Sequence, residues 1–192
     1  MPRASFELNG VKIKPGSRLQ VDVPVARLYT HAPLHIPVEV VHGRRQGPVM
    51  LVCGGIHGDE INSVEIVRRL MRSKQIQGLN GTLIAVPIVN VFGFMQHSRY
   101  LPDRRDLNRC FPGSETGSLG ARVAALFREQ IVDHATHIID LHTGAIHRTN
   151  LPQIRAQLSR GSETERMANA FGAPVILNAE LREGSLRHYA QT

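Results

Sequence analysis

Largely apolar runs constrain the fold of this chain more than any other feature of its sequence. They stand at residues 48–53, 82–88, 137–141 and 173–177. Runs of this kind are typical of strands that are covered on both faces of a sheet. Segments with a helical spacing of apolar residues alternate with them, at residues 60–73, 118–132 and 163–171. This alternation predicts an α/β fold around a mostly parallel central sheet.

The N-terminal part of the chain follows a different pattern. Apolar and polar residues alternate there in short stretches, at residues 11–13, 19–23 and 36–41. A period of two predicts half-buried strands joined as hairpins. We therefore expect an N-terminal β-hairpin region over residues 1–45, followed by an α/β domain over residues 46–192.

The charge balance is basic, with a formal net charge of +7. The basic residues are scattered, and the sequence has neither a zinc-finger spacing nor an RNA-binding aromatic motif. We therefore expect no nucleic-acid partner and a small carboxylate-bearing substrate instead. No apolar run is long enough to cross a bilayer, so we expect no membrane association. A low cysteine content and the lack of an apolar N-terminal leader favour the cytoplasm.

A glycine-rich turn after the first apolar run carries two candidate metal ligands, His57 and Glu60. Residues three apart on a helical turn share a face, so this imidazole and carboxylate can converge on one ion. The flanking glycines allow a sharp turn and a close approach of the backbone. Taken alone, the pattern also fits a glycine-rich turn with an incidental histidine. His142, which follows another apolar run, favours the metal site, because two imidazoles and one carboxylate suit a catalytic zinc ion with one open position.

Further polar residues accompany these three. Asp140 stands two positions before His142, and such residues of a strand point to the same side, so Asp140 is a candidate to orient the imidazole. A carboxylate that caps the following turn is the alternative. Asn108 and Arg109 are adjacent donors in the long irregular segment 89–117. A guanidinium binds a carboxylate through two parallel hydrogen bonds, although solvated loop residues would show the same pattern.

Three motifs together resemble those of the succinylglutamate desuccinylase/aspartoacylase family, a branch of the zinc-carboxypeptidase-like α/β/α sandwich fold. In family order they read Gly-Gly-Ile-His57-Gly-Asp-Glu60, Asp106-Leu-Asn108-Arg109-Cys-Phe-Pro-Gly and Asp140-Leu-His142-Thr-Gly. The resemblance runs from about residue 46 to the end of the chain. It implies that His57, Glu60 and His142 bind one zinc ion.

The same resemblance implies roles for residues of the long loop. Asn108 and Arg109 would bind the substrate carboxylate or polarise its carbonyl group. Arg99 is a weaker match to a further substrate-binding arginine, because the interval between Arg99 and Asp106 is longer than in the family pattern.

The general base of the family is a glutamate in a later strand, well beyond the second zinc histidine. In this sequence Glu180 and Glu183 lie in a segment that resembles the stretch before that strand. By resemblance the general base is expected beyond Thr192, with Glu183 as the fallback. The α/β domain is accordingly expected to be incomplete at its C-terminus.

The sequence thus predicts a zinc-dependent hydrolase that cleaves the amide bond of an N-acyl amino acid or a similar small amide. A zinc carboxypeptidase or a peptide amidase on the same scaffold is an alternative, and so is a catalytically silent zinc-binding fragment. An exposed strand edge near residues 175–177 would also favour a homo-oligomer.

Overall fold

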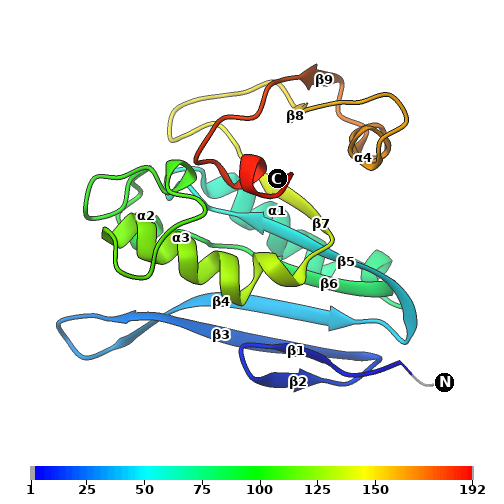
Figure 1. Cartoon of the computed structure of the whole chain (residues 1–192), viewed down its shortest axis with the longest axis horizontal. Helices are drawn as coiled ribbons and strands as arrows, with labels where there is room; N and C mark the ends of the chain where they lie inside the picture. The colour runs from blue at the N-terminus through cyan, green and yellow to red at the C-terminus, as the bar shows by residue number, and fades with distance from the viewer. Residues whose placement is uncertain (1–2, 192) are drawn as a thin grey trace.

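A five-stranded sheet forms the centre of this computed structural model, which describes residues 3–191 (Figure 1). The strand order is β3-β4-β6-β5-β7. The strands are β3 (Ser17–Arg27), β4 (Pro33–His42), β5 (Arg45–Gly54), β6 (Asn80–Val86) and β7 (His137–Leu141). The three apolar runs at 48–53, 82–88 and 137–141 therefore occupy β5, β6 and β7.

The sheet is mixed, and the prediction of a mostly parallel sheet is wrong for β3 and β4. Strand β5 is parallel to both β6 and β7, whereas β4 is antiparallel to β3 and to β6. A short turn joins β4 to β5, so these two strands run in opposite directions. Because β6 is parallel to β5, it must then be antiparallel to β4.

The strands of residues 1–45 do not all form one N-terminal hairpin region. Strands β3 and β4 belong to the central sheet, while β1 (Phe6–Leu8) and β2 (Val11–Ile13) form a separate two-stranded hairpin. The expected boundary near residue 45 consequently falls between two strands of one sheet. The domain division itself stays a prediction.

Helices cover both faces of the central sheet. Helix α1 (Ile61–Arg72) packs on one face, where Val67 and Met71 lie in a cluster with Val52 of β5. Helices α2 (Val91–Met95) and α3 (Leu119–Gln130) lie on the other face, where Phe127 belongs to the same cluster as Cys53. Alternate residues of β5 thus enter two cores, as expected of a strand covered on both sides.

The predicted helices are present as α1, α3 and α4 (Glu163–Phe171). The hydroxyl of Ser118 accepts a hydrogen bond from the backbone N–H of Ala121 at 3.2 Å, which caps α3. Helix α4 ends at Gly172, whose φ of +73° is the left-handed conformation that glycine favours.

The last predicted strand forms, but not in the central sheet. Strand β9 (Val175–Asn178) pairs in parallel with β8 (Gln153–Ala156), which the sequence pattern did not reveal. Figure 1 shows this pair and α4 above the central sheet, with the short helix α5 (Leu186–Tyr189) beneath them. None of the helices within residues 3–191 has the length and apolar character that a membrane crossing requires.

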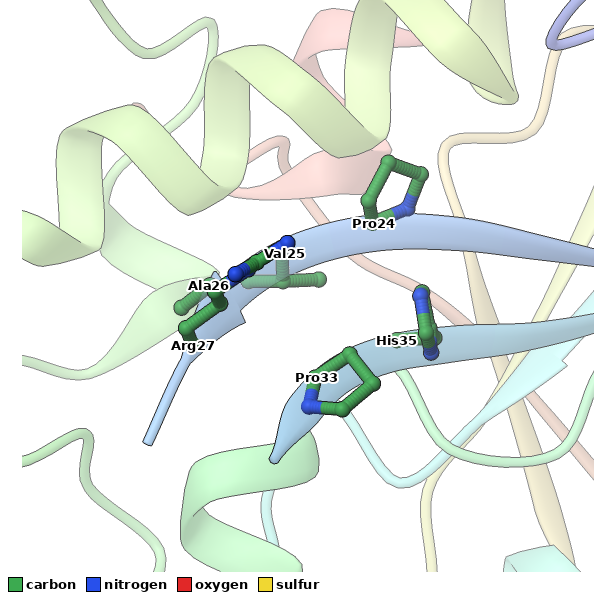
Figure 2. Close-up of a pocket in the computed structure, with 6 residues that line it drawn as sticks. All are labelled: Pro24, Val25, Ala26, Arg27, Pro33 and His35. Carbon is green, nitrogen blue, oxygen red and sulfur yellow. The ribbon is translucent and has the colours of Figure 1, made fainter. Parts of the chain in front are cut away.

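A shallow hollow of about 370 Å³ lies at the tips of β3 and β4 (Figure 2). Residues 24–27 of β3 line it together with Pro33 and His35 of β4. Because β3 is the sheet edge opposite β7, this hollow shares no residue with the candidate site described below.

Candidate metal centre

The structure brings together the three ligands predicted from the sequence. One potential ligand atom each of His57, Glu60 and His142 lies within 4.8 Å of the others. His57 follows β5, Glu60 immediately precedes α1, and His142 follows β7. Strands β5 and β7 are parallel neighbours, so their carboxyl ends lie side by side. Active sites of open α/β sheets gather outside the carboxyl ends of the strands.

His57 and Glu60 converge through a tight turn before α1, not through the first turn of a helix. The backbone N–H of Glu60 donates to the carbonyl of His57 at 3.2 Å and closes this turn. Two glycines permit it. Gly55 has a φ of +60°, and a Cβ on Gly58 would lie 2.0 Å from the carbonyl carbon of Gly93 in α2.

Both histidines present the same ring nitrogen to Glu60. The Nδ1 atom of His57 lies 2.6 Å from Oε1 of Glu60, and the Nδ1 atom of His142 lies 3.0 Å from Oε2. Oε2 also accepts a hydrogen bond from the backbone N–H of Thr143 at 3.0 Å. Two imidazole nitrogens and a carboxylate therefore face one small volume.

The opposite ring nitrogens are each held by another carboxylate. Nε2 of His142 lies 2.8 Å from Oδ2 of Asp140, and Nε2 of His57 lies 3.1 Å from Oδ1 of Asp106. Carboxylates in these positions orient metal-binding imidazoles and set which nitrogen carries the proton. The spacing of Asp140 and His142 predicted the first pair. The second pair was missed, because no local spacing links Asp106 to a residue 49 positions earlier.

Arg99 lies at the cluster, closer than its weak match in sequence suggested. Its guanidinium donates to Oδ2 of Asp106 at 2.8 Å, and Nη1 lies 3.6 Å from Oε1 of Glu60. Arg99 therefore links the carboxylate behind His57 to the carboxylate that both imidazoles face.

The electrostatics of the cluster favour bound positive charge. Burial opposes ionisation of Glu60, but its hydrogen bonds with His142 and His57 outweigh this and lower its pKa to about 2. Burial likewise opposes charge on His142, yet the negative charge and hydrogen bond of Asp140 raise its pKa to about 10. The pKa of Asp106 is far below its usual range despite burial, because His57 and Arg99 stabilise its charge.

The donor set fits zinc. Zinc binds imidazole nitrogen and carboxylate oxygen, and its catalytic sites use three protein ligands with one position left open. The two Nδ1 atoms and Glu60 would form the ligating set, while Asp106 and Asp140 lie against the opposite ring nitrogens. His57 and Glu60 are buried and the His142 side chain is 36% exposed, so the cluster is reached from the His142 side.

Asn108 lies beside the cluster, and its side-chain amide makes hydrogen bonds within the protein. Its Oδ1 accepts a hydrogen bond from the backbone N–H of Leu186 at 2.9 Å, and its Nδ2 lies 3.3 Å from Nε2 of His142. The amide thus ties the 107–109 turn to the start of α5. Its role in substrate binding stays a prediction.

Arg109 is half-buried and its guanidinium donates to the backbone carbonyl of Asn108. Burial lowers its pKa, and the charges of Arg182 and Arg99 act in the same direction, while Asp106 opposes them. Arg182, which the sequence analysis did not single out, is therefore part of the positive field around Arg109. An anion bound there would relieve the mutual repulsion of these guanidinium groups.

The fallback general base is not placed at the cluster. Glu183 and Glu180 are exposed, and within residues 3–191 neither side chain makes a hydrogen bond or ion pair with His57, Glu60 or His142. The segment that carries them is nevertheless close to the site loop, since the backbone N–H of Phe111 donates to the carbonyl of Gly184 at 3.0 Å.

Residues 46–192 match the model of the succinylglutamate desuccinylase/aspartoacylase catalytic domain. The chain belongs to this family. It is also 33% identical, over 147 residues, to N-alpha-acetyl-L-2,4-diaminobutyric acid deacetylase of Halomonas elongata. That alignment covers 74% of this chain and 43% of the relative, so the chain spans less than half the length of the deacetylase.

Solved structures of the family superpose on nearly the whole chain. A succinylglutamate desuccinylase/aspartoacylase from Rhodobacter sphaeroides has a TM-score of 0.78 at 26% identity, covering 99% of this chain and 57% of its own. An aspartoacylase family protein from Mesorhizobium loti has a TM-score of 0.77 at 27% identity, covering 95% and 59% respectively. The family fold therefore extends to the N-terminal strands, which the family model does not match.

Proposed function

We propose that this chain carries the zinc site of a hydrolase that cleaves the amide bond of an N-acyl amino acid or a similar small amide. The observation that carries the proposal is the paired support of the ligands. His57 and His142 both direct Nδ1 at Glu60, and Asp106 and Asp140 hold the opposite nitrogens. Membership of a family of deacylating enzymes, and a relative named as a deacetylase, support the reaction class.

Three groups of residues have different roles in the proposed reaction. His57, Glu60 and His142 would bind zinc, which when bound supplies a Lewis acid and a nucleophile at neutral pH. Asp106 and Asp140 keep the two imidazoles oriented, so the ligand geometry is set before substrate arrives. Arg99 stabilises the negative charge of Asp106 and Glu60.

Arg109 is the proposed contact for the substrate carboxylate. One guanidinium N–H is engaged by the carbonyl of Asn108, which leaves the remaining donors of the fork for an anion. The neighbouring charges of Arg99 and Arg182 add to the attraction. A small N-acyl amino acid places a carboxylate close to the scissile amide, so one such anchor can align it.

Metal binding and hydrolysis test this proposal together. We expect one zinc ion per chain, with ligand distances near ~2.0–2.2 Å by X-ray absorption. Glu60→Gln should abolish stoichiometric binding. Glu65→Gln, a change on the exposed face of α1 where Glu65 pairs with Arg68 and Arg69, should leave it unchanged. A wild-type chain that is folded by circular dichroism but binds no zinc on reconstitution would refute the metal assignment.

A substrate panel separates the proposed reaction from the alternatives on the same scaffold. Release of acyl group from N-acyl amino acids in the zinc-loaded chain supports the deacylase. Release of C-terminal residues from peptides would support a carboxypeptidase instead. Zinc binding without turnover of either class would identify a silent zinc-binding fragment.

A further inference from the structure

A buried thiol lies directly behind the carboxylate that supports His142. Cys53 of β5 is the register partner of Asp140 on β7, and its side chain is 0% exposed. Its Sγ lies 3.7 Å from Oδ1 of Asp140 and 3.8 Å from the carbonyl oxygen of Ile139. These are the separations of a weak S–H donor near its acceptors.

The two supporting carboxylates are held in different ways. Oδ1 and Oδ2 of Asp106 accept hydrogen bonds from the backbone N–H of Asn108 and from the guanidinium of Arg99. Oδ2 of Asp140 faces His142, and within residues 3–191 the thiol of Cys53 is the group that can donate to Oδ1 of Asp140. The carboxylate of Asp140, which faces His142, is therefore held by the neutral thiol of Cys53, whereas the carboxylate of Asp106 is held by the charged guanidinium of Arg99.

The thiol keeps its proton in this environment. Burial raises the pKa of Cys53 well above its ordinary value, and the negative charge of Asp140 raises it further. Cys53 is thus a donor to the carboxylate at neutral pH and does not add a second negative charge behind it.

We propose that Cys53 is a positioning residue for the metal centre. Its thiol proton holds the Asp140 carboxylate in the rotation that presents Oδ2 to Nε2 of His142, which aims Nδ1 of His142 at the ligand cluster. The inference rests on the zinc site of the proposed function. It adds a residue that acts on the metal through Asp140 and His142 without touching the metal or the substrate.

The first test measures zinc affinity by competition with a chelator. Cys53→Ala and Cys53→Val both remove the donor, and the valine also refills the space of the sulfur. Loss of a group that supports a ligand costs 10–100-fold in metal affinity, and Cys53 acts one contact further away, so we expect about 3–10-fold weaker binding in both variants. Cys53→Ser restores a hydroxyl donor and should bind within about 2-fold of wild type.

Val86→Ala is the matched control for loss of core packing. Val86 is the register partner of Cys53 on β6, is 0% exposed and lies in the same core cluster. The Val86→Ala variant should have a lower free energy of unfolding, because the smaller side chain leaves a cavity in the core. Its zinc affinity should equal that of the wild type. Wild-type affinity in both Cys53→Ala and Cys53→Val, or an equal loss in Val86→Ala, would overturn the positioning role.

A second measurement needs no metal. The ring N–H proton that His142 shares with Asp140 should give a downfield resonance in NMR spectra of the metal-free chain, since its acceptor at 2.8 Å slows exchange. It should shift and broaden in Cys53→Ala and Cys53→Val but persist in Cys53→Ser and Val86→Ala. If the wild-type chain binds no zinc, the proposed zinc site is refuted. The resonance alone then tests whether Cys53 positions Asp140 and His142. An unchanged resonance in Cys53→Ala and Cys53→Val would overturn that role.

Discussion

Oδ1 of Asp106 lies 3.1 Å from Nε2 of His57, although the two residues are separated by helix α1, strand β6 and helix α2. The contact makes Asp106, a residue of the long segment after α2, part of the candidate metal centre. It also places Arg99 at the cluster, because the same carboxylate holds the guanidinium at 2.8 Å.

Replacing Asp106 with asparagine should weaken zinc binding by about 10–100-fold, the usual effect of losing a carboxylate that supports a metal-binding histidine. The amide keeps the shape but removes the charge that makes the imidazole a better ligand. Chelator competition measures the change. Asp103→Asn is the matched control, because Asp103 belongs to the same loop but accepts from the backbone of Gly120. Equal affinities of Asp106→Asn and wild type would remove Asp106 from the metal centre.

Arg109→Lys should weaken the binding of a carboxylate ligand by about 1–3 kcal/mol, the range for hydrogen bonds to charged groups. The charge is retained, but an ammonium cannot reproduce the two parallel hydrogen bonds of a guanidinium. Calorimetry with an amino-acid product of the reaction measures the loss. Arg105→Lys, a change at an exposed residue of the same loop that lies 3.8 Å from Asp103, should have no effect. Unaltered affinity in Arg109→Lys would show that Arg109 is a solvated loop residue and does not bind the carboxylate.

Gly58→Ala should destabilise the fold by about 2–3 kcal/mol, the cost of forcing extra atoms into a packed interior. The new Cβ would meet the backbone of Gly93 at 2.0 Å, and a backbone cannot move aside as a flexible side chain can. Denaturant unfolding of the metal-free chain measures the change.

Gly78→Ala serves as the comparison for Gly58→Ala, because a Cβ there meets nothing within 4 Å and the cost comes from a φ of +73° alone. That cost is about 1 kcal/mol. The Gly58 variant should also lose zinc, since the same turn carries His57 and Glu60. Equal destabilisation by the two changes would show that the contact with Gly93 relaxes freely.

Glu183→Gln should change neither zinc affinity nor the rate of amide hydrolysis. The side chain is exposed and, within residues 3–191, makes no hydrogen bond or ion pair with the three candidate ligands, so we expect it to play no part in proton transfer. The carboxylates of Glu60, Asp106 and Asp140 each lie against a histidine or an arginine. Because a positioned acid–base group contributes about 10²–10⁴-fold, we expect the 192-residue chain to hydrolyse N-acyl amino acids slowly. Rapid turnover that Glu183→Gln abolishes would identify Glu183 as the base.

Local spacing was enough to predict the parts of the structure that depend on neighbouring residues. Helical periodicity over residues 118–132 and 163–171 predicted α3 and α4, and the apolar runs predicted the strands of the parallel core. The candidate ligands and Asp140 were predictable for the same reason. His57 and Glu60 are three apart on one turn, and Asp140 and His142 are two apart at the end of one strand.

Tertiary structure decided which of these parts meet. The direction of β4 relative to β6, and the pairing of β9 with β8 outside the central sheet, follow from the order in which strands pack, which local periodicity does not encode. The same holds for the groups behind the ligands. Asp106 reaches His57 from the start of the 107–109 turn, and Cys53 reaches Asp140 because the two residues are register partners on β5 and β7. The sequence alone therefore determined the types of candidate ligand, and the packing of β5 beside β7 brought His57 and Glu60 to His142.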